Sequence, residues 1–370
     1  QLTAIALTAA MVGSLTACGG SKPAETTAAP KEEAKTEAPA ETEAKAEESK
    51  EEAAASGDLI TVGYAQVGAE SDWRTANTES FKSTFTEENG YKLIFDDAQQ
   101  KQENQIKAIR SFIQQDVDYI VLAPVTETGW DAVLGEAKQA GIPVIIVDRM
   151  VDVKDDSLYT AWVGSNFELE GKKAAAYLDA YMKAKNMKDM KLVNIQGTIG
   201  ASAQIGRTKG LDDAVAANGW NLLDKTTGEF TQAKGQEVMQ SFLKKYKKDI
   251  NVVYCENDNE AFGAIDAIKA AGYEVGADKD MMVFSFDSTK EGLKKVQSGE
   301  ITLNTECNPL HGPRVEAIIK QLENKKTPEK KAYVDEEMFA HDDTVKSVTV
   351  DGKEYPVTVV TKEVMGTRKY

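Results

Sequence analysis

The sequence is poor in the side chains on which much enzymatic and metal chemistry depends. Its 370 residues include 3 cysteines and 2 histidines, which leave few candidates for thiol catalysis, imidazole chemistry or a soft-metal site. Basic charge is also scarce, since 60 acidic residues oppose 44 lysines and arginines and give a formal charge of −16. Nucleic acids require a basic surface, so this composition excludes them as partners. We expect no metal and no other cofactor.

A long apolar run at the N-terminus is missing as well. The apolar stretch 2–17 is too short and too polar to span a bilayer comfortably, and it ends at Cys18. The tetrad Leu-Thr-Ala-Cys at 15–18, followed by two glycines, resembles a bacterial lipobox, in which a signal peptide is cleaved before a cysteine that then carries lipid. We expect residues 1–18 to be a signal remnant and Cys18 a lipid anchor. The alternative is a plain secretory signal with an incidental cysteine.

The segment 19–57 contains no valine, isoleucine, leucine or aromatic residue. Ordering such a segment costs about 1–2 kcal/mol per residue with no apolar burial to offset the loss of entropy. Its ten glutamates, five lysines and three prolines favour an extended linker. We therefore expect a disordered tether that holds a lipid-anchored protein at the outer face of the cell membrane.

From Asp58 onward, short apolar runs alternate with stretches of helical spacing, as repeated βα units do. The runs are rich in β-branched residues, which suits strands buried on both faces of a parallel sheet. Strands are expected at 59–65, 93–95, 119–123, 144–147, 192–195, 252–254, 282–286 and 301–303. The pattern predicts an α/β fold of two doubly wound parallel-sheet lobes, and such sheets bind ligands beyond the carboxyl ends of their strands.

A helix expected at about 310–324 follows a strand that ends near Cys307, so the chain is expected to cross between the two halves more than once. Multiple crossings make a hinge. We expect the first lobe to contain residues 58–164 and 308–332, and the second lobe residues 165–307 and 333–370. Around Asp351-Gly352 the tail has the turn chemistry of a terminal hairpin.

Polar residues follow the predicted strands of the first half. After the first strand stand Ser71 and the pair Trp73-Arg74, which we expect to be exposed at a strand-to-helix turn. A sugar presents an apolar C–H face to an aromatic ring and a rim of hydroxyls to charged planar groups. The fourth strand ends in Asp148-Arg149, an acceptor beside a five-donor fork that can bind adjacent hydroxyls. The alternatives are that Trp73 packs in the core and that Asp148 and Arg149 form an ion pair that closes a loop.

The strand ends of the second half are again polar, with Thr198, Arg207, Asn257 and Asp287 at or after them. Any one of them could cap a helix, and for the neighbouring Asp258 and Ser288 capping is the expected role. A full set of amide, carboxylate and guanidinium groups at successive strand ends is harder to explain by capping. It favours a binding site for hydroxyl groups.

Taken together, these motifs resemble the type I periplasmic sugar-binding proteins of ABC transporters. The resemblance covers residues 59 to about 340 and is carried by Ala65-Gln66-Val67-Gly68, Ser71, Trp73-Arg74, the run 97–102, Ala123-Pro124-Val125, Val147-Asp148-Arg149, Gln196-Gly197-Thr198, Asn257-Asp258 and Phe286-Asp287. The galactofuranose-binding branch is the most similar, because of Trp73-Arg74, the run Gln-Gln-Lys-Gln at 99–102 and Thr128-Gly129-Trp130. Ribose-binding relatives carry paired phenylalanines in place of Trp73-Arg74.

The resemblance implies roles for individual residues. It implies that hydroxyl groups are bound by Asp148, Arg149, Arg207, Asn257 and Asp287, and that Trp73 and Arg74 form a stacking and polar wall. A polar ligand residue of the family stands where this chain has Cys307-Asn308, which leaves Asn308 or Glu306 as the candidate.

The same resemblance implies a function. It implies a monomeric, extracytoplasmic lipoprotein that closes its lobes on a monosaccharide, galactofuranose or a related furanose or pentose, and delivers it to the permease of an ABC transporter. The alternative is a sensor that presents the sugar to a membrane signalling kinase. No acid–base pair with a nucleophile is visible in the sequence, so we do not expect an enzyme.

Overall fold

The structure, a computed structural model, describes residues 59–370. The expected signal remnant, the expected lipid anchor Cys18 and the expected tether therefore lie outside the described residues. Residues 59–370 belong to one structural unit, and that unit contains two main β-sheets that we call the first and second lobes.

The first lobe is a six-stranded, all-parallel sheet with strand order β11-β5-β4-β3-β1-β2. Its strands are β1 (Ile60–Gln66), β2 (Tyr91–Asp97), β3 (Tyr119–Leu122), β4 (Val144–Val147), β5 (Ala161–Gly164) and β11 (Lys331–Tyr333). Its helices are α1 (Asp72–Thr84), α2 (Gln102–Gln114), α3 (Asp131–Gln139) and α9 (Gly312–Glu323), with short 3-10 turns η1 (Glu87–Asn89) and η2 (Asp156–Leu158).

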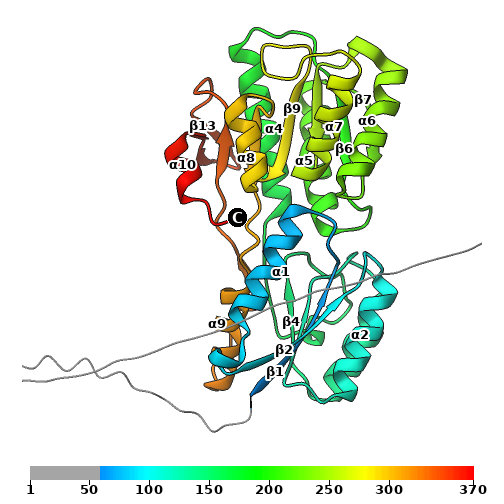
Figure 1. The fold of residues 1–370 in the computed structure, drawn as a ribbon, viewed down its shortest axis with the longest axis vertical. Coiled ribbons are helices and arrows are strands. Elements are labelled where there is room, and N and C mark those ends of the chain that lie inside the picture. The colour runs from blue at the N-terminus through cyan, green and yellow to red at the C-terminus, as the bar shows by residue number, and fades with distance from the viewer. Residues whose placement is uncertain (1–58) are drawn as a thin grey trace, which may run out of the picture. The chain divides into compact units, whose positions relative to one another are not determined.

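Helices cover both faces of this first sheet, which explains the unbroken apolar runs of its central strands. Every residue of β3 and β4 is buried. Successive residues of β3 alternate between two cores: Val121 packs with α1 and α9, and Ile120 packs with α2 and α3. Strands that are buried on both faces show no alternation of polar and apolar residues. The observed strand pairing confirms the expectation of a parallel sheet (Figure 1).

The second lobe is a seven-stranded mixed sheet with strand order β15-β12-β10-β9-β8-β6-β7, in which only the β10–β12 pair is antiparallel. Its strands are β6 (Lys191–Gln196), β7 (Asn221–Thr227), β8 (Val252–Cys255), β9 (Met282–Asp287), β10 (Leu303–Glu306), β12 (Met338–Ala340) and β15 (Thr358–Val359). Its helices are α4 (Phe167–Ala184), α5 (Ser202–Asn218), α6 (Gln232–Tyr246), α7 (Asp258–Ala270), α8 (Lys290–Ser298) and α10 (Lys362–Thr367), with the 3-10 turn η3 (Lys247–Asp249).

The predicted strand at 301–303 is wrong, because β10 begins only at Leu303. The turn after α8 drives the Ile301 side chain into the core between the sheet and helices α6 to α8. An apolar residue there reflects burial and not strand structure. The fold class itself, two doubly wound lobes, is confirmed.

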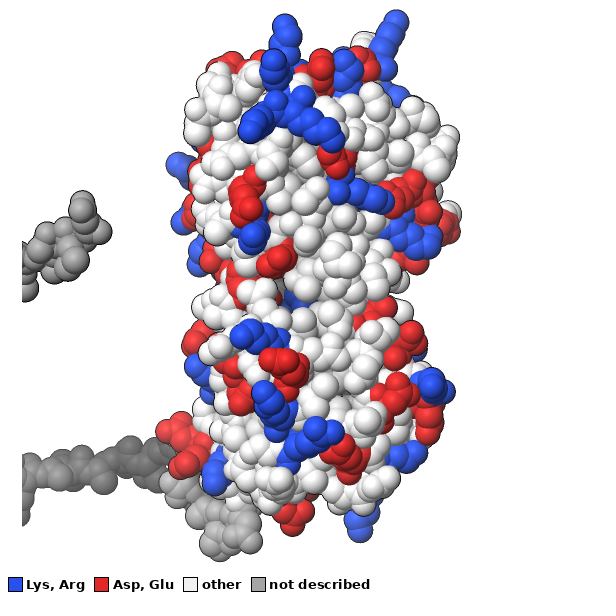
Figure 2. Space-filling model, turned by 90° about the vertical axis from the view of Figure 1, so that its right-hand side faces the viewer, with Lys and Arg blue, Asp and Glu red and all other residues white. Residues whose placement is uncertain are grey.

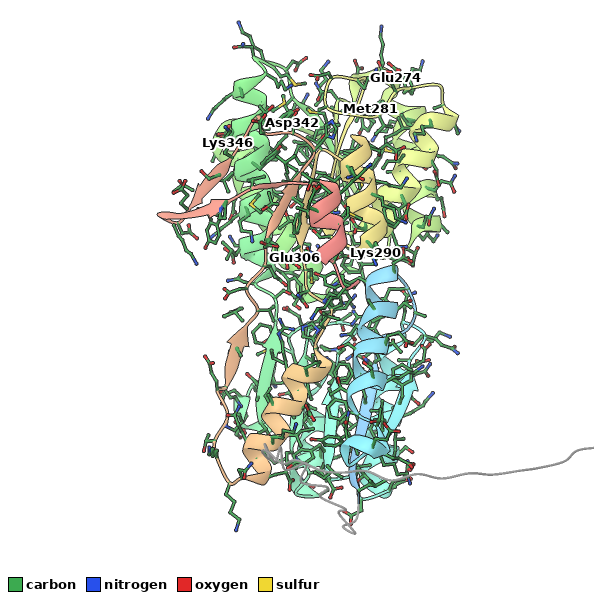
Figure 3. The ribbon with its side chains drawn as sticks, turned by 60° about the vertical axis from the view of Figure 1, so that its left-hand side comes forward. Glu274, Met281, Lys290, Glu306, Asp342 and Lys346 are labelled. Atoms are coloured by element: carbon green, nitrogen blue, oxygen red, sulfur yellow. The ribbon has the colours of Figure 1, made fainter. Side chains whose placement is uncertain are left out.

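The chain passes between the lobes three times, at β5 to α4, at β10 to α9 and at β11 to β12. These three segments form the hinge, and Figure 3 shows Glu306 beside them, at the level where the lobes meet. The expected multi-stranded hinge is therefore present. Because α9 returns to the first lobe and packs along α1, the first lobe is built from residues that are far apart in the sequence.

The tail adds a small hairpin of β13 (Ser347–Val350) and β14 (Lys353–Pro356), and β13 packs against α4. Asp351 and Gly352 form its turn with positive φ values of 51° and 79°, as a two-residue hairpin turn requires. This confirms the predicted hairpin. The apolar residues after it instead form β15 and extend the second sheet.

On the face in Figure 2, lysines and arginines are interspersed with aspartates and glutamates over both lobes. That face therefore offers no continuous basic surface for a polyanion. Among the helices of residues 59–370, none has the length and the apolar character needed to cross a membrane.

Candidate functional site

A small pocket lies where the two lobes meet. It is lined by Glu70, Ser71, Trp73, Arg74, Asp148, Arg149, Phe167, Ala203, Arg207, Phe230, Asn257, Asp287 and Cys307. The lining comes from both lobes and the hinge, and most of it follows the carboxyl ends of strands, where doubly wound sheets bind ligands.

Several lining residues have a strained backbone that aims them into the cavity. Asp148, Phe230 and Asp287 have φ values of 64°, 61° and 100°, a region that side-chain-bearing residues seldom adopt and that clusters at functional sites. Gly197 makes room for the Phe230 ring, since a Cβ on this glycine would lie 1.9 Å from it. The strand ends are thus shaped to present two carboxylates and an aromatic ring.

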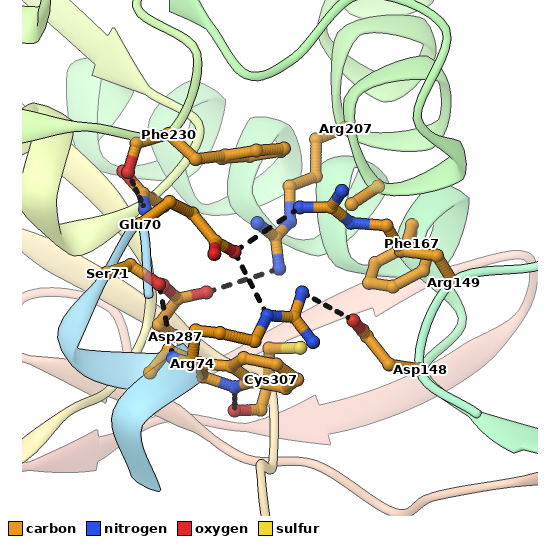
Figure 4. A pocket seen from close by; sticks show the side chains of 13 residues that line it. Glu70, Ser71, Arg74, Asp148, Arg149, Phe167, Arg207, Phe230, Asp287 and Cys307 are labelled. Carbon is orange, nitrogen blue, oxygen red and sulfur yellow. Dashed lines mark hydrogen bonds and ion pairs between the residues drawn. The ribbon is translucent and has the colours of Figure 1, made fainter. Parts of the chain in front are cut away.

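Arg74 lies between two carboxylates of the first lobe (Figure 4). Its Nε donates to Glu70 Oε1 at 3.0 Å, and its Nη2 donates to Asp148 Oδ2 at 2.8 Å. Burial by itself would lower the pKa of Arg74, but the two carboxylates outweigh burial and raise the pKa above its usual value. Arg74 is therefore a firmly charged and fixed donor.

Arg149 is less fully compensated. Its Nη1 donates to the Val125 carbonyl oxygen at 3.1 Å, and its Nη2 is 3.7 Å from Glu70 Oε1. Its guanidinium carbon lies 5.0 Å from the centre of the Phe230 ring. Burial and then the neighbouring charge of Arg74 lower the pKa of Arg149. A guanidinium has five N–H donors, so this side chain retains donors for a ligand.

Arg207, on α5, is the cation of the second lobe. Its Nε donates to Glu170 Oε2 at 2.7 Å, and its Nη2 is 3.4 Å from Asp287 Oδ1. A further donor binds the carbonyl oxygen of Glu256, and the Phe286 ring centre lies 4.8 Å from the guanidinium carbon. Burial raises the pKa of Asp287 well above its usual value, and the attraction of Arg207 only partly opposes this shift.

Aromatic side chains form the apolar walls. Trp73, Phe167 and Phe230 belong to one small buried cluster in which both lobes and the hinge take part. Trp73 is 4% exposed, so the expectation of an exposed tryptophan is wrong. The ring lies between the lobes, where its Nε1 donates to the Cys307 carbonyl oxygen at 2.6 Å.

The formal charges of the lining cancel, with three arginines against Glu70, Asp148 and Asp287. Such a cavity suits a neutral polar molecule better than an anion. Within residues 59–370, Glu70 Oε2 and Arg74 Nη1 are buried and have no hydrogen-bond partner. Buried polar atoms are nearly always satisfied, so an acceptor and a donor stand ready for a ligand with hydroxyl groups.

The lobes are in a closed arrangement around this cavity. Besides the tryptophan contact, Asp72 N donates to Asn259 Oδ1 at 3.0 Å across the lobes. Met150 N donates to Ser202 Oγ at 2.9 Å at a second point of contact. These bonds can form only when the lobes approach each other, so they would break on opening.

Eight of the ten predicted ligand residues line the cavity, and two do not. Thr198 and Asn308 are absent from the lining. Thr198 is part of the loop before α5, where its carbonyl oxygen accepts from Ala201 N. Asn308 caps a turn, its Oδ1 accepting from Leu310 N at 3.0 Å. The lining also includes Cys307, although the alternative candidate Glu306 does not line it.

Two of the lining residues also have local structural roles. Ser71 caps α1 by accepting from Arg74 N at 3.1 Å. Asn257 caps α7, with its Oδ1 accepting from Glu260 N and its Nδ2 donating to the Phe230 carbonyl oxygen. Their side chains therefore position the loops that bear the charged groups.

The expected caps Asp258 and Ser288 are each wrong by one residue. Asn257 caps α7 in place of Asp258, and Thr289 caps α8 in place of Ser288. Asp258 instead accepts from Thr289 N and Asn304 Nδ2 at the ends of three adjacent strands. Ser288 N donates to Asn304 Oδ1. Capping preferences do not distinguish adjacent polar residues.

Sequence reasoning missed Glu70, Phe167, Ala203 and Phe230. Glu70 precedes α1 within a motif that was recognised, so its carboxylate could have been included. The two phenylalanines gave no signal, because an apolar residue in a loop or at a helix start is equally consistent with core packing. Trp130 is fully buried in the core of the first lobe.

Both cysteines among residues 59–370 are buried and unpaired. Three side chains of types that can bind a metal ion lie together in this part of the chain: an oxygen of Glu170, an oxygen of Glu336 and Cys307 Sγ lie within 4.8 Å of one another. Burial raises the pKa of the Cys307 thiol well above its usual value.

Comparison with known proteins gives concordant matches. The model of a family described as "Periplasmic binding protein domain" matches residues 62–311. The galactofuranose-binding protein YtfQ of Escherichia coli K12 is 45% identical over 275 residues, which cover 73% of this chain and 85% of that protein.

Two solved structures are similar along the same region. A Mycobacterium smegmatis protein in complex with β-D-fucofuranose is 41% identical, with a TM-score of 0.73 and coverage of 77% of this chain and 93% of that one. The binding protein of the arabinose ABC transporter of Shewanella sp. ANA-3, bound to L-arabinofuranose, is 42% identical, with a TM-score of 0.71 and the same coverage. All three relatives are named or described as binding proteins or ligand complexes and none as an enzyme.

Proposed function

Because the chain belongs to the periplasmic binding protein family, we propose that it is the extracytoplasmic receptor of an ABC importer for a monosaccharide in its furanose form. It is a binding protein and not an enzyme. Galactofuranose is the leading candidate ligand, and arabinofuranose and fucofuranose are its nearest alternatives.

The single observation that carries this proposal is the composition of the cavity lining. Three guanidinium groups and three carboxyl groups give a neutral site rich in both donors and acceptors, and aromatic walls enclose it. A monosaccharide is neutral and has hydroxyls that each donate and accept, together with apolar C–H faces. An anionic solute would leave the carboxyl groups uncompensated.

Two observations support a furanose. Relatives at 41–45% identity are described with galactofuranose, fucofuranose or arabinofuranose as the bound sugar. The pair Trp73-Arg74, by which the sequence departs from ribose-binding relatives, lies in the cavity, with the Arg74 guanidinium carbon 4.6 Å from the tryptophan ring. This pair places an aromatic ring and a charged hydrogen-bond donor side by side in the pocket wall.

Closure of the lobes supplies the mechanism. The first lobe contributes five of the polar lining residues and the second lobe three, so neither lobe alone can bind the ligand fully. The ligand binds the closed form more strongly than the open form and shifts the population toward it. A closed receptor displays a different surface to its partner from an open one, which couples sugar capture to delivery at the permease.

The lipid anchor at Cys18 and the tether belong to the same proposal. They would keep the receptor close to its transporter at the outer face of the membrane. Metabolic labelling with a palmitate analogue tests the anchor, using a Cys18→Ala variant as the matched control; labelling that persists in the variant would contradict it.

A panel of sugars tests the proposed ligand class. We expect galactofuranose or arabinofuranose to raise the melting temperature of purified residues 59–370, because a ligand that binds only the native state stabilises it. The matched pyranose-locked methyl glycosides should give no shift. If no furanose stabilises the protein and an acidic solute does, the proposal is wrong.

A further inference from the structure

The three hinge segments converge on one carboxyl group. Glu336 lies in the third segment, and its Oε1 accepts from Ser165 Oγ in the first segment at 2.6 Å. The same oxygen accepts from Asn308 N in the second segment at 2.8 Å. Glu336 therefore connects all three passages of the chain between the lobes, and its position depends on the relative orientation of the lobes.

Glu336 itself is half-buried, and a fully buried carboxyl group lies next to it. An oxygen of Glu170, on α4, is within 4.8 Å of an oxygen of Glu336. Glu170 is 1% exposed; its Oε2 accepts from Arg207 at 2.7 Å, but its Oε1 has no partner among the described residues. A buried acceptor without a donor requires an explanation, and two adjacent carboxylates, one buried and one half-buried, would repel each other.

One proton on Glu336 resolves both problems. It removes one negative charge, and it turns the Glu336 carboxyl group into a donor for the unpaired oxygen of Glu170. The surroundings favour this state: burial, then the charge of Glu170 and a hydrogen bond to it, raise the pKa of Glu336 well above its usual value.

We infer that Glu336 carries a proton that it shares with Glu170, and that this carboxyl pair couples closure of the hinge to the position of Arg207 in the ligand cavity. The inference rests on the proposed function. Glu170 is the link, because its Oε2 accepts from Arg207 and one of its oxygens lies within 4.8 Å of an oxygen of Glu336. Glu336 is a positioning residue, since it acts on the ligand only through Glu170 and Arg207.

The charged environment of the pair is mixed. The other groups that face Glu336 are Lys173 from α4, Glu306 and Cys307 from the end of β10, and Lys353 from β14. Lys173 Nζ donates to the Glu336 carbonyl oxygen at 3.0 Å and not to the carboxyl group. Burial also lowers the pKa of Lys173.

The coupling predicts a direction for the pH dependence. Opening the lobes separates the hinge segments and admits water, which favours the charged form of Glu336. The closed form therefore binds the proton more tightly, and sugar affinity should fall as the pH rises above the usual glutamate pKa of about 4.3. One coupled proton gives at most about a tenfold loss of affinity per pH unit.

Stability should follow the same sign. A carboxyl group whose pKa is raised in the folded state stabilises the protein at low pH, and that contribution is lost as the pH rises from about 4.3 through the raised value. Other buried acids of the protein contribute similar slopes, so the informative quantity is the difference between two variants.

Glu336→Gln is the informative variant, because its amide can accept from Ser165 and Asn308 while donating to Glu170, as the protonated acid does. Glu337→Gln, at the adjacent exposed position, is the matched control. We expect melting temperature without sugar and sugar affinity, both followed from pH 5 to pH 9, to vary less in Glu336→Gln than in wild type and in the control. Equal pH profiles in all three proteins would overturn the inference.

Calorimetry of the wild-type protein keeps the inference testable if the variant does not fold. Titration of galactofuranose in two buffers of different ionisation enthalpy should reveal proton uptake on binding near neutral pH; absence of uptake would overturn the coupling. A change in affinity caused by zinc or by EDTA would also overturn it, in favour of a metal site. If no sugar binds at any pH, the proposed function fails, and the sugar-free melting profiles still decide whether the pair holds a proton.

Discussion

Replacing Arg149 by alanine removes a buried cation that the protein itself leaves partly unpaired. In the structure its guanidinium makes one hydrogen bond, to a backbone carbonyl oxygen, and a longer ion pair at 3.7 Å. At least two of its donors should therefore reach sugar hydroxyls. Hydrogen bonds with a charged partner contribute about 1.5–3 kcal/mol each, so losing two should cost about 3–6 kcal/mol, or roughly a 10²- to 10⁴-fold loss of affinity.

The stability of the Arg149→Ala protein should change much less than its affinity. Burial and the charge of Arg74 lower the pKa of Arg149, which means that the folded protein gains little from holding this cation. Arg149→Lys should recover only part of the affinity, because a single ammonium cannot reproduce the planar fork.

Isothermal titration calorimetry with the stabilising furanose measures the effect. Arg110→Ala is the matched control, since Arg110 is on the surface of the same lobe and pairs with the exposed Glu136. The control should bind like wild type. An Arg149→Ala affinity within about threefold of wild type would refute the assignment of this arginine to the ligand.

Two further predictions concern Trp73 and His311. Trp73→Phe keeps an aromatic wall but loses the indole hydrogen bond to the hinge, a net loss of about 0.5–1.5 kcal/mol; stopped-flow measurements should show sugar dissociating roughly 2- to 10-fold faster, and an unchanged dissociation rate would contradict the closing role of this bond. Burial lowers the pKa of His311 from 6.5 to about 4. The neutral imidazole therefore stabilises the folded state above pH 6.5, by about 3 kcal/mol at 1.36 kcal/mol per pKa unit. This contribution to the free energy of unfolding is lost as the pH falls toward 4. Urea unfolding at pH 4.5 and pH 7 should show a smaller loss in His311→Gln than in wild type, with the partly buried His341→Gln as control; equal losses would contradict the argument.

Much of the fold could be predicted because it depends on local patterns. Strands such as β3 and β4 are continuous runs of β-branched and apolar residues, and helices between them repeat apolar residues on one face. Strand β7 was missed, because it is an edge strand in which polar residues such as Asp224 and Lys225 are tolerated. Strand β5 was missed because its sequence Ala-Trp-Val-Gly has a single β-branched residue, unlike the runs of β3 and β4.

The candidate site was predictable to the extent that chemistry gathers at strand ends. Polar residues at or shortly after the ends of β1, β4, β8 and β9 line one cavity, because parallel strands bring their carboxyl ends to the same edge. The same rule also selected Thr198, which is not in the lining, since a residue after a strand can turn toward its own loop. It could not find Phe167 or Phe230, whose apolar character says nothing about which cavity they face.

The sequence by itself determined which groups are available: the number of arginines and carboxylates, their places after the strands, and the apolar periodicity that forces two layered lobes. These depend on local spacing and on composition. Only the tertiary structure decided which groups meet, because the hinge joins segments near 165, 308 and 336 that are far apart in the chain. The fold buries Arg74, Arg149 and Arg207 beside carboxylates and places Glu336 near Glu170, and no local pattern carries the geometry of those contacts.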